Sequence, residues 1–271
     1  MSSRTSVART LDLNADLGEG IATSTMRADD LDDALLGVVT SANVACGGHA
    51  GDASSMARVC AIAVERGVAI GAQVSYVDRA GFGRTRLHVA PATLRAQLLE
   101  QLGELRAHAR SAGGRVAYLK PHGALYNTAA DEPEVADAVV AAVLEDAADH
   151  RQLPVLTLPG SALALRARAA GIEVVGEAFA DRAYTRTGRL VPRSHDGAVI
   201  TDADAVVARV LRLESDGVIR ADDGSDVAVS ARSVCLHSDT DGAVDLARRV
   251  RQALWAAGVV LTPFSGVRRA G

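Results

Sequence analysis

The stretch Leu119–Asn127, LKPHGALYN, places a lysine, a proline, a histidine and a glycine directly after an apolar run. The preceding residues Val116–Leu119, VAYL, have the composition of a short buried β-strand. Lys120 and His122 fall on one side of a β-type alternation, because the proline between them keeps its predecessor extended. Gly123 then permits a sharp exit of the chain or a close backbone approach to a ligand. The stretch therefore predicts a strand whose carboxyl end carries functional groups.

Short β-type runs of this kind alternate with helix-type segments along the chain. The predicted strands are Thr10–Leu13, Ser41–Cys46, Val68–Gln73, Val116–Lys120, Pro154–Leu158, Ile172–Glu177 and Ser233–His237. Segments between them, such as Asp52–Arg66 and Pro91–Ala112, have helical spacing and helix end signals. Parallel strands joined by crossover helices produce this pattern, so the chain is predicted to be α/β. Seven units without a linker favour a closed (β/α) barrel over an open doubly wound sheet, as a single domain over residues 1–271.

One segment interrupts the alternation. Asp181–Asp196 is too polar for a strand in a core and too long for a plain connector between elements. Long irregular segments in compact domains are commonly functional. We therefore predict a functional loop insertion near residues 181–196.

Composition excludes several classes of protein. The chain has 271 residues, 48% of them hydrophobic, and a net charge of −4 with acidic and basic residues interspersed. This balance supplies neither a basic stripe for nucleic acid nor a polybasic segment for a membrane. The absence of an apolar run of about 18 residues, or of a signal peptide, predicts a soluble cytoplasmic protein. Cys46, Cys60 and Cys235 form no CxxC pair and are predicted to be buried reduced thiols.

Polar side chains follow nearly every predicted strand. In a parallel barrel the carboxyl ends of the strands share one face, which is where active sites are built. The residues predicted to converge there are Asp12, Asn14, Asp16, Glu19, His49, Asp52, Gln73, Lys120, His122, Asn127, Glu177, Asp181, Arg182, His237 and Asp239.

Each of these positions also has a structural interpretation. Asp52 can simply cap the helix that follows it. Asn14 and Asn127 can stabilise turns through side-chain bonds to nearby backbone. One histidine near a strand end is more often structural than functional, whereas three at corresponding ends, with carboxylates nearby, favour a site. The chain has neither GxxxxGK[ST] nor a strand followed by GxGxxG, and Gly81–Arg84, GFGR, is only a weak candidate for cradling an anion.

Several blocks of sequence resemble the LamB/YcsF family, the A subunits of bacterial 5-oxoprolinase. These blocks are LNADLGEG (13–20), SANVACGGHAGD (41–52), GAQVSYVDRAGFGR (71–84), LKPHGALYN (119–127), EAFADRAYTRTGRLVPR (177–193) and VCLHSDT (234–240). The resemblance implies a seven-stranded TIM-like (β/α) barrel of the glycoside hydrolase and deacetylase type. It implies ATP-dependent opening of the lactam ring of 5-oxo-L-proline to L-glutamate, with Mg²⁺ accompanying ATP. It also implies an assembly with 5-oxoprolinase subunits B and C.

Within this resemblance, the hypothesis for the catalytic groups is Asp16, Lys120, His122 and Asp181. Asp16 or Asp181 would act as a base toward water, since burial at a barrel mouth shifts the pKa of a carboxylate. Lys120 and Arg182 would hold a carboxylate or a phosphate. His49 and His122 would transfer protons or hold a divalent ion. The residues assigned to substrate binding are Asn14, Glu19, His49, Asn127, Arg182, His237 and Asp239.

Two alternatives stay open at this stage. In the first, Asp16, His49 and His122 hold a metal ion and the chain is a stand-alone metal-dependent hydrolase or deacetylase. In the second, the chain binds the lactam without catalysing its opening.

The sequence also departs from the commonest family pattern. Gln73 replaces a histidine, and an amide cannot shuttle a proton at neutral pH. Val74 and Val77 replace prolines. Gly48 replaces an aromatic residue, which we expect to open the wall beside His49. Ser238 replaces a glycine, which we expect to disturb a backbone turn.

Overall fold

The computed structural model describes residues 9–239 and 242–265. The strands are β1 (Thr10–Leu17), β2 (Ser41–Ala45), β3 (Ala69–Val74), β4 (Val116–Pro121), β5 (Val155–Thr157), β6 (Val174–Phe179), β7 (Val218–Arg220), β8 (Asp226–Ala228), β9 (Ser233–Leu236) and β10 (Val260–Leu261). The helices are α1 (Ala28–Leu36), α2 (Ala53–Arg66), α3 (Pro91–Ser111), α4 (Gly123–Asp131), α5 (Pro133–Asp146), α6 (Ala162–Ala169), α7 (Ala203–Asp216) and α8 (Ala243–Ala256).

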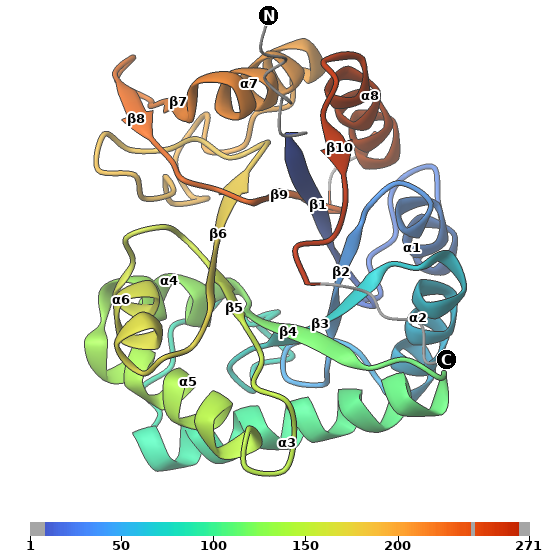
Figure 1. Ribbon diagram of the computed structural model, residues 1–271, viewed down its shortest axis with the longest axis vertical. Helices are drawn as coiled ribbons and strands as arrows, with labels where there is room; N and C mark the ends of the chain where they lie inside the picture. Colours follow the sequence, from blue (N-terminus) through green and yellow to red (C-terminus); the bar gives the residue numbers. More distant parts are fainter. Residues whose placement is uncertain (1–8, 240–241, 266–271) are drawn as a thin grey trace, which may run out of the picture.

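Seven parallel strands form a closed barrel. Their order is β1, β2, β3, β4, β5, β6 and β9, and β9 pairs back with β1. Helices surround this ring, as Figure 1 shows. The predicted closed seven-stranded α/β barrel is therefore confirmed, and the open doubly wound sheet is excluded.

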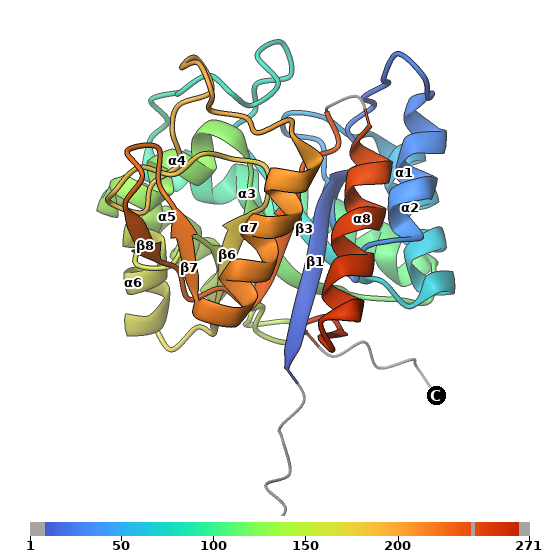
Figure 2. The same cartoon turned by 90° about the horizontal axis from the view of Figure 1, so that it is seen from above.

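Two small additions lie outside the predicted pattern. The first residues of β1, Thr10 and Leu11, pair with β10, while Asp12–Ala15 pair with β9. The hairpin of β7 and β8 lies between α7 and β9 and forms a separate antiparallel pair. In Figure 2, β1 runs the height of the barrel, and the long loops after β3 and β6 gather at its carboxyl end.

The barrel interior is polar because alternate residues of several strands point polar side chains inward. On β1 these are Asp12, Asn14 and Asp16, all buried. Gly71 on β3 leaves room for the Tyr118 ring, since a Cβ at position 71 would lie 2.1 Å from that ring. A glycine in a strand commonly marks such a close approach.

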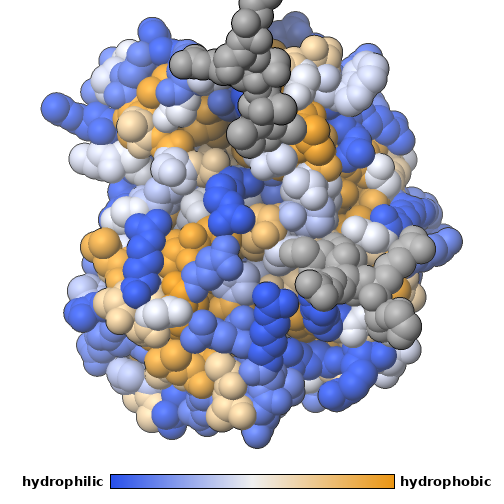
Figure 3. Space-filling model, in the orientation of Figure 1, coloured by the Kyte–Doolittle hydropathy of each residue, from blue (hydrophilic) through white to orange (hydrophobic). Residues whose placement is uncertain are grey.

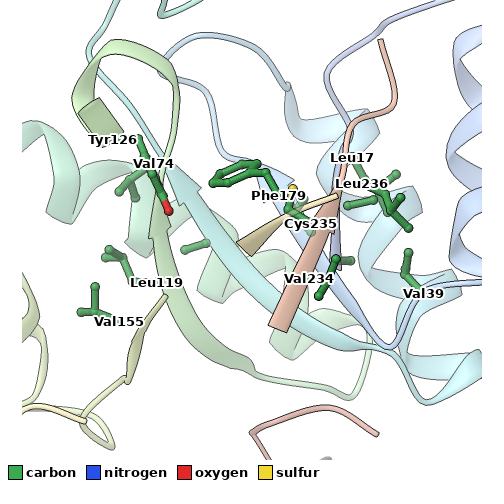
Figure 4. Close-up of a cluster of buried hydrophobic side chains, with 14 of the residues drawn as sticks. Leu17, Val39, Val74, Leu119, Tyr126, Val155, Phe179, Val234, Cys235 and Leu236 are labelled. Atoms are coloured by element: carbon green, nitrogen blue, oxygen red, sulfur yellow. The ribbon is translucent and has the colours of Figure 1, made fainter. Parts of the chain in front are cut away.

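The apolar core lies mainly between the barrel and its helices. Leu17, Val39 and Leu236 belong to this cluster and lie together in Figure 4. Burial of such side chains supplies the main driving force for folding. On the end of the barrel that Figure 3 shows, hydrophobic and hydrophilic residues are interspersed.

The segment after β6 is irregular, as expected for residues 181–196. Two isolated antiparallel bridges, Arg182 with Val199 and Tyr184 with Leu190, hold it in place. The Arg182 guanidinium also donates to the carbonyls of Ala198 and Val191, at 3.1 and 2.6 Å. This loop covers part of the carboxyl end of the barrel (Figure 2).

Candidate active site at the carboxyl end of the barrel

Lys120 stands at the centre of the candidate site and is the only lysine in the chain. Its Nζ lies 3.2 Å from Asp16 Oδ1 and 2.8 Å from Glu177 Oε1. Burial acts to lower the pKa of Lys120, but Asp16, Cys235 and Glu177 outweigh it and hold that pKa well above its usual value. Burial acts to raise the pKa of Asp16, yet the charge of Lys120 outweighs it and holds that pKa well below its usual value. Both groups are therefore charged at neutral pH.

Glu177 and Tyr126 are buried polar groups without hydrogen bonds. The contact of Lys120 with Glu177 is an ion pair outside hydrogen-bond geometry, so neither Glu177 oxygen has a hydrogen-bond partner among the described residues. The Tyr126 hydroxyl also makes no hydrogen bond within that part of the chain, although Glu177 lies near it. Burial and the nearby Glu177 raise the pKa of Tyr126 well above its usual value, so its hydroxyl keeps its proton. Tyr126 packs edge to face on Phe179, with ring centroids 5.5 Å apart (Figure 4).

A second cluster joins Glu19, His49, Gln73 and His122. His49 Nε2 lies 3.0 Å from Glu19 Oε1, and His49 Nδ1 lies 3.0 Å from Ser75 Oγ. The Gln73 amide donates to Glu19 Oε1 at 3.0 Å and to His122 Nδ1 at 2.9 Å. Burial lowers the pKa of His49, which favours the neutral ring.

The hydrogen bonds assign the tautomer of His122. Its Nδ1 accepts from the amide of Gln73, so the ring proton is on Nε2. That Nε2 donates to the carbonyl of Phe82 at 3.3 Å. The His122 ring stacks on the His49 ring, with centroids 3.7 Å apart and planes 8° from parallel.

Three members of this cluster are groups that could hold a metal ion. Glu19, His49 and His122 each place one ligand atom within 4.8 Å of the others. The set differs from the predicted one, because Glu19 stands where Asp16 was expected and Asp16 is bound to Lys120.

The arrangement does not fit an ion as it stands. The Gln73 amide nitrogen already lies between Glu19 and His122. Imidazole nitrogens bind metals in the plane of the ring, and two rings stacked 3.7 Å apart share no such plane.

Asp181 and His237 form a separate pair. His237 Nδ1 lies 2.8 and 2.9 Å from the two carboxylate oxygens of Asp181. Burial acts to raise the pKa of Asp181, but His237 outweighs it and the net shift is downward. The His237 ring stacks on Phe179, with centroids 5.5 Å apart.

A cavity of about 400 Å³ connects these groups. Eight of the predicted site residues line it, namely Asp16, Glu19, Lys120, His122, Asn127, Arg182, His237 and Asp239. The remaining three contact lining residues: Asn14 contacts Lys120, Asp181 contacts His237, and His49 contacts Glu19. Asn14 Oδ1, for example, accepts from Lys120 Nζ at 3.2 Å.

Some predicted residues are engaged differently from the expectation. Arg182 uses two donors on backbone carbonyls of its own loop. Asn127 is exposed and donates to the carbonyl of Gly123 at 3.2 Å, in keeping with its structural interpretation. Asp52 caps α2, accepting from the backbone of Ser55 at 2.8 Å.

Two expectations about the sequence departures are wrong. Gly48 does not open the wall beside His49, because a Cβ there would lie 2.4 Å from Ser75 Oγ and 2.5 Å from Gln101 Oε1. Side chains of neighbouring elements thus fill that space. Ser238 does not disturb its turn, since Phe82 alone has positive φ among the described residues other than glycine.

Sequence reasoning did not assign roles to Tyr126 or Arg193, and it included Arg84 only in the weak anion-cradling motif GFGR; all three line the cavity. Tyr126 lies in an apolar helical stretch, where an aromatic side chain is typical of a core. Arg84 lies in the loop after β3 and Arg193 in the loop after β6. These loops are far apart in the sequence and meet only in the folded protein.

Known proteins resemble this chain over nearly its whole length. A model of the LamB/YcsF family matches residues 11–269. The A subunit of 5-oxoprolinase from Streptomyces avermitilis is 57% identical over 256 residues, which cover 94% of this chain and 100% of that protein. The A subunit of 5-oxoprolinase from Streptomyces coelicolor is 56% identical over the same shares.

A solved structure is also similar. The lactam utilization protein from Thermus thermophilus aligns with a TM-score of 0.84 and 40% identity, covering 94% of this chain and 100% of that chain. Among the described residues, every helix is too short or too polar to span a bilayer.

Proposed function

The chain belongs to the LamB/YcsF family, and from this premise we propose that it is the A subunit of an ATP-dependent 5-oxoprolinase. In this proposal the assembly opens the lactam ring of 5-oxo-L-proline to L-glutamate and hydrolyses ATP, supplied with Mg²⁺, alongside subunits B and C. The observation that carries the proposal is the 57% identity to the A subunit of a 5-oxoprolinase over that protein's whole length. The cytoplasmic location stays a prediction.

The cavity supports chemistry on a small cyclic amide. Its volume of about 400 Å³ suits a small molecule rather than a polymer. A lactam carbonyl is a poor electrophile, so phosphorylation of its oxygen by ATP would prepare the carbon for attack by water. Lys120, charged and in the lining, would stabilise negative charge developing on that oxygen.

His237 is the better candidate for the base toward water. Asp181 is buried behind it and both its oxygens face His237 Nδ1, so Asp181 would act by orienting the imidazole. His237 lines the cavity and leaves Nε2 for a water molecule. Asp16 is a weaker candidate, because a carboxylate with a depressed pKa is a poor base at neutral pH.

The unpartnered Tyr126 hydroxyl supports a ligand at this place. Buried polar groups in native proteins nearly always have hydrogen-bond partners. Tyr126 lines the cavity with its proton retained, so it would donate a hydrogen bond to the lactam.

The test is glutamate release from 5-oxo-L-proline by the chain with subunits B and C and ATP. Lys120→Met removes the charge and keeps the length of the side chain, and we expect turnover to fall at least about a hundredfold, or about 2.7 kcal/mol of transition-state stabilisation. Arg110→Met, on an exposed position of α3, removes a cation away from the cavity and is the matched control.

Circular dichroism of the variant separates loss of chemistry from loss of fold, because Lys120→Met leaves Asp16 and Glu177 unpaired. Undiminished turnover in a folded Lys120→Met protein would contradict the role of Lys120. Glutamate release without ATP, abolished by a chelator, would instead identify a metal-dependent hydrolase and overturn the proposed function.

A further inference from the structure

Three loops meet at the mouth of the cavity through one carboxylate. Asp239 Oδ2 accepts from Arg84 Nη2 at 2.7 Å and from Arg193 Nη1 at 3.1 Å. Arg84 follows β3, Arg193 follows β6 and Asp239 follows β9. All three side chains line the cavity, and the arginines are 44% and 33% exposed.

The loop that carries Arg84 is built rigidly onto the imidazole cluster. Gly83 has φ +65°, and a Cβ there would lie 2.7 Å from the Cβ of His49. Phe82 has φ 54°, and its carbonyl accepts from His122 Nε2. The Arg84 guanidinium lies 5.0 Å from the centroid of the Phe82 ring. Arg84 is therefore held in a fixed place relative to His49 and His122.

The electrostatics of the mouth favour an anion. Arg84, Arg189 and Arg193 line the cavity. Arg189 pairs with Asp131 at 2.8 Å, so Arg84 and Arg193 share the single carboxylate of Asp239 and keep a net positive charge. Burial acts to raise the pKa of Asp239, but Arg193, His237 and Arg84 outweigh it, so Asp239 is ionised. A carboxylate is thus stable between these two arginines.

The bond between Asp239 and the arginines can be exchanged. Ion pairs with solvent-exposed arginines contribute little to stability, typically about 0 to 1 kcal/mol. A ligand carboxylate can accept the same donors and form a bidentate pair with an arginine. No rearrangement of the Arg84 loop is then required.

We propose that Arg84 and Arg193 form a seat for the carboxylate of a small ligand, and that Asp239 occupies this seat when no ligand is bound. The ligand class is a small monoanionic carboxylate whose uncharged end reaches toward Lys120. The identity of the ligand rests on the proposed function, in which the seat receives the carboxylate of 5-oxo-L-proline. The seat gives the weak GFGR motif a role, and makes Asp239 a competitor of the substrate rather than one of its ligands.

The test is calorimetric titration of the full chain with two lactams. 5-Oxo-L-proline carries a carboxylate, whereas 2-pyrrolidinone has the same ring without it. We expect Arg84→Gln and Arg193→Gln each to raise the dissociation constant of 5-oxo-L-proline at least about tenfold. The dissociation constant of 2-pyrrolidinone is expected to stay within about twofold of the wild-type value. Arg86→Gln is the matched control, because Arg86 pairs with Glu132 at 2.7 Å and lies outside the cavity lining.

Asp239→Asn gives the sharpest outcome. Removing the internal competitor is expected to strengthen binding of 5-oxo-L-proline several-fold and to leave 2-pyrrolidinone unchanged. Weaker binding of 5-oxo-L-proline to Asp239→Asn, or equal losses for both lactams in the arginine variants, would overturn the seat.

Titration with cyclopentanecarboxylate, a monoanionic five-membered ring without the amide, separates the seat from the proposed function. Arg84-dependent binding of cyclopentanecarboxylate, without binding of 5-oxo-L-proline, would uphold the seat and remove 5-oxo-L-proline as its ligand. Failure of both carboxylates to bind the folded chain would overturn the seat. In that case glutamate release by the complete assembly would still support the proposed function.

Discussion

Gln73 shows how one residue changes the chemistry available to a cluster. Its amide nitrogen is bound to both Glu19 and His122, and the second bond fixes the tautomer of the imidazole. The amide donates without carrying a charge. The cluster of Glu19, His49 and His122 is therefore arranged as a hydrogen-bonded network.

We predict that removing this amide makes the cluster bind metal more tightly. A metal ion entering the wild-type cluster must break two hydrogen bonds of Gln73, each worth about 0.5 to 1.5 kcal/mol. Gln73→Ala removes that cost and opens space between Glu19 and His122. Titration with Co²⁺, followed by its visible absorption, is expected to show at least about tenfold tighter binding by Gln73→Ala.

The control for this experiment is Gln73→Ala combined with His49→Ala, which removes one of the ligand groups. The double variant is expected to return to weak binding. Co²⁺ binding by the wild-type chain that is as tight as binding by Gln73→Ala would contradict the inference that the hydrogen bonds of Gln73 oppose metal binding.

Individual site residues were predictable from sequence where a polar or charged side chain follows directly on a predicted strand. Asp16, Lys120 and His122 were recognised because polar groups interrupt apolar runs at strand ends, and the structure places all three in the cavity lining. Arg193 was not recognised, and Arg84 entered only through the weak GFGR motif, because each lies in an irregular loop. Exposed arginines are common, and only contact with a shared carboxylate distinguishes these two.

At the scale of single elements, α2 begins with a reciprocal cap. Asp52 accepts from the Ser55 backbone, and Ser55 Oγ accepts from the Asp52 backbone, each at 2.8 Å. These bonds satisfy two backbone donors near the start of the helix. The Asp52 side chain is exposed and lies outside the lining of the cavity.

We predict that Asp52 is structural. Asp52→Ala is expected to lower the free energy of unfolding by about 1 kcal/mol, since the cap is lost. Denaturant titration measures this change, and turnover of the assembly is expected to stay within about twofold. Asp52→Asn retains a capping oxygen and is the matched control. A loss of turnover in Asp52→Ala far beyond that in Asp52→Asn would point to a catalytic role instead.

The strand β1 shows why element bounds were harder to predict than element types. The predicted strand ended at Leu13, because the polar residues Asn14 and Asp16 were assigned to the region beyond it. The structure extends β1 to Leu17, with both polar residues inside the barrel. A polar residue in a buried strand violates the usual pattern unless the interior itself is polar.

Across the whole molecule, the polar interior forms a continuous chain of hydrogen bonds. Asn14 Nδ2 donates to Ser233 Oγ at 2.7 Å, and Asn43 Nδ2 donates to Asn14 Oδ1 at 2.7 Å and to Asp16 Oδ1 at 2.8 Å. Ser233 in turn donates to Asp12. The chain therefore connects Asp12, deep in the barrel, with the ion pair of Asp16 and Lys120 at the site.

Asp12 is expected to make the stability of the whole fold depend on pH. Burial raises its pKa from 3.8 to about 6, against the lowering effect of hydroxyl donors from Ser233, Ser41 and Thr40. Between pH 3.8 and about pH 6, Asp12 is ionised in the unfolded chain but still protonated in the folded chain. Stability from Asp12 is therefore present at low pH and is lost as the pH rises through 6.

We predict that Asp12→Asn removes this dependence. One pKa unit corresponds to about 1.4 kcal/mol, so ionisation of Asp12 lowers the free energy of unfolding by about 3 kcal/mol at neutral pH. About 2 kcal/mol of this loss develops between pH 4 and 7.5. Urea unfolding at several pH values is expected to show the stability of Asp12→Asn, relative to wild type, rising by about that amount across this range. Asp137→Asn, at an exposed position of α5, supplies the baseline. Because any fixed effect of the new amide cancels between pH values, a difference that stays flat would mean that Asp12 is ionised in the folded barrel already at pH 4.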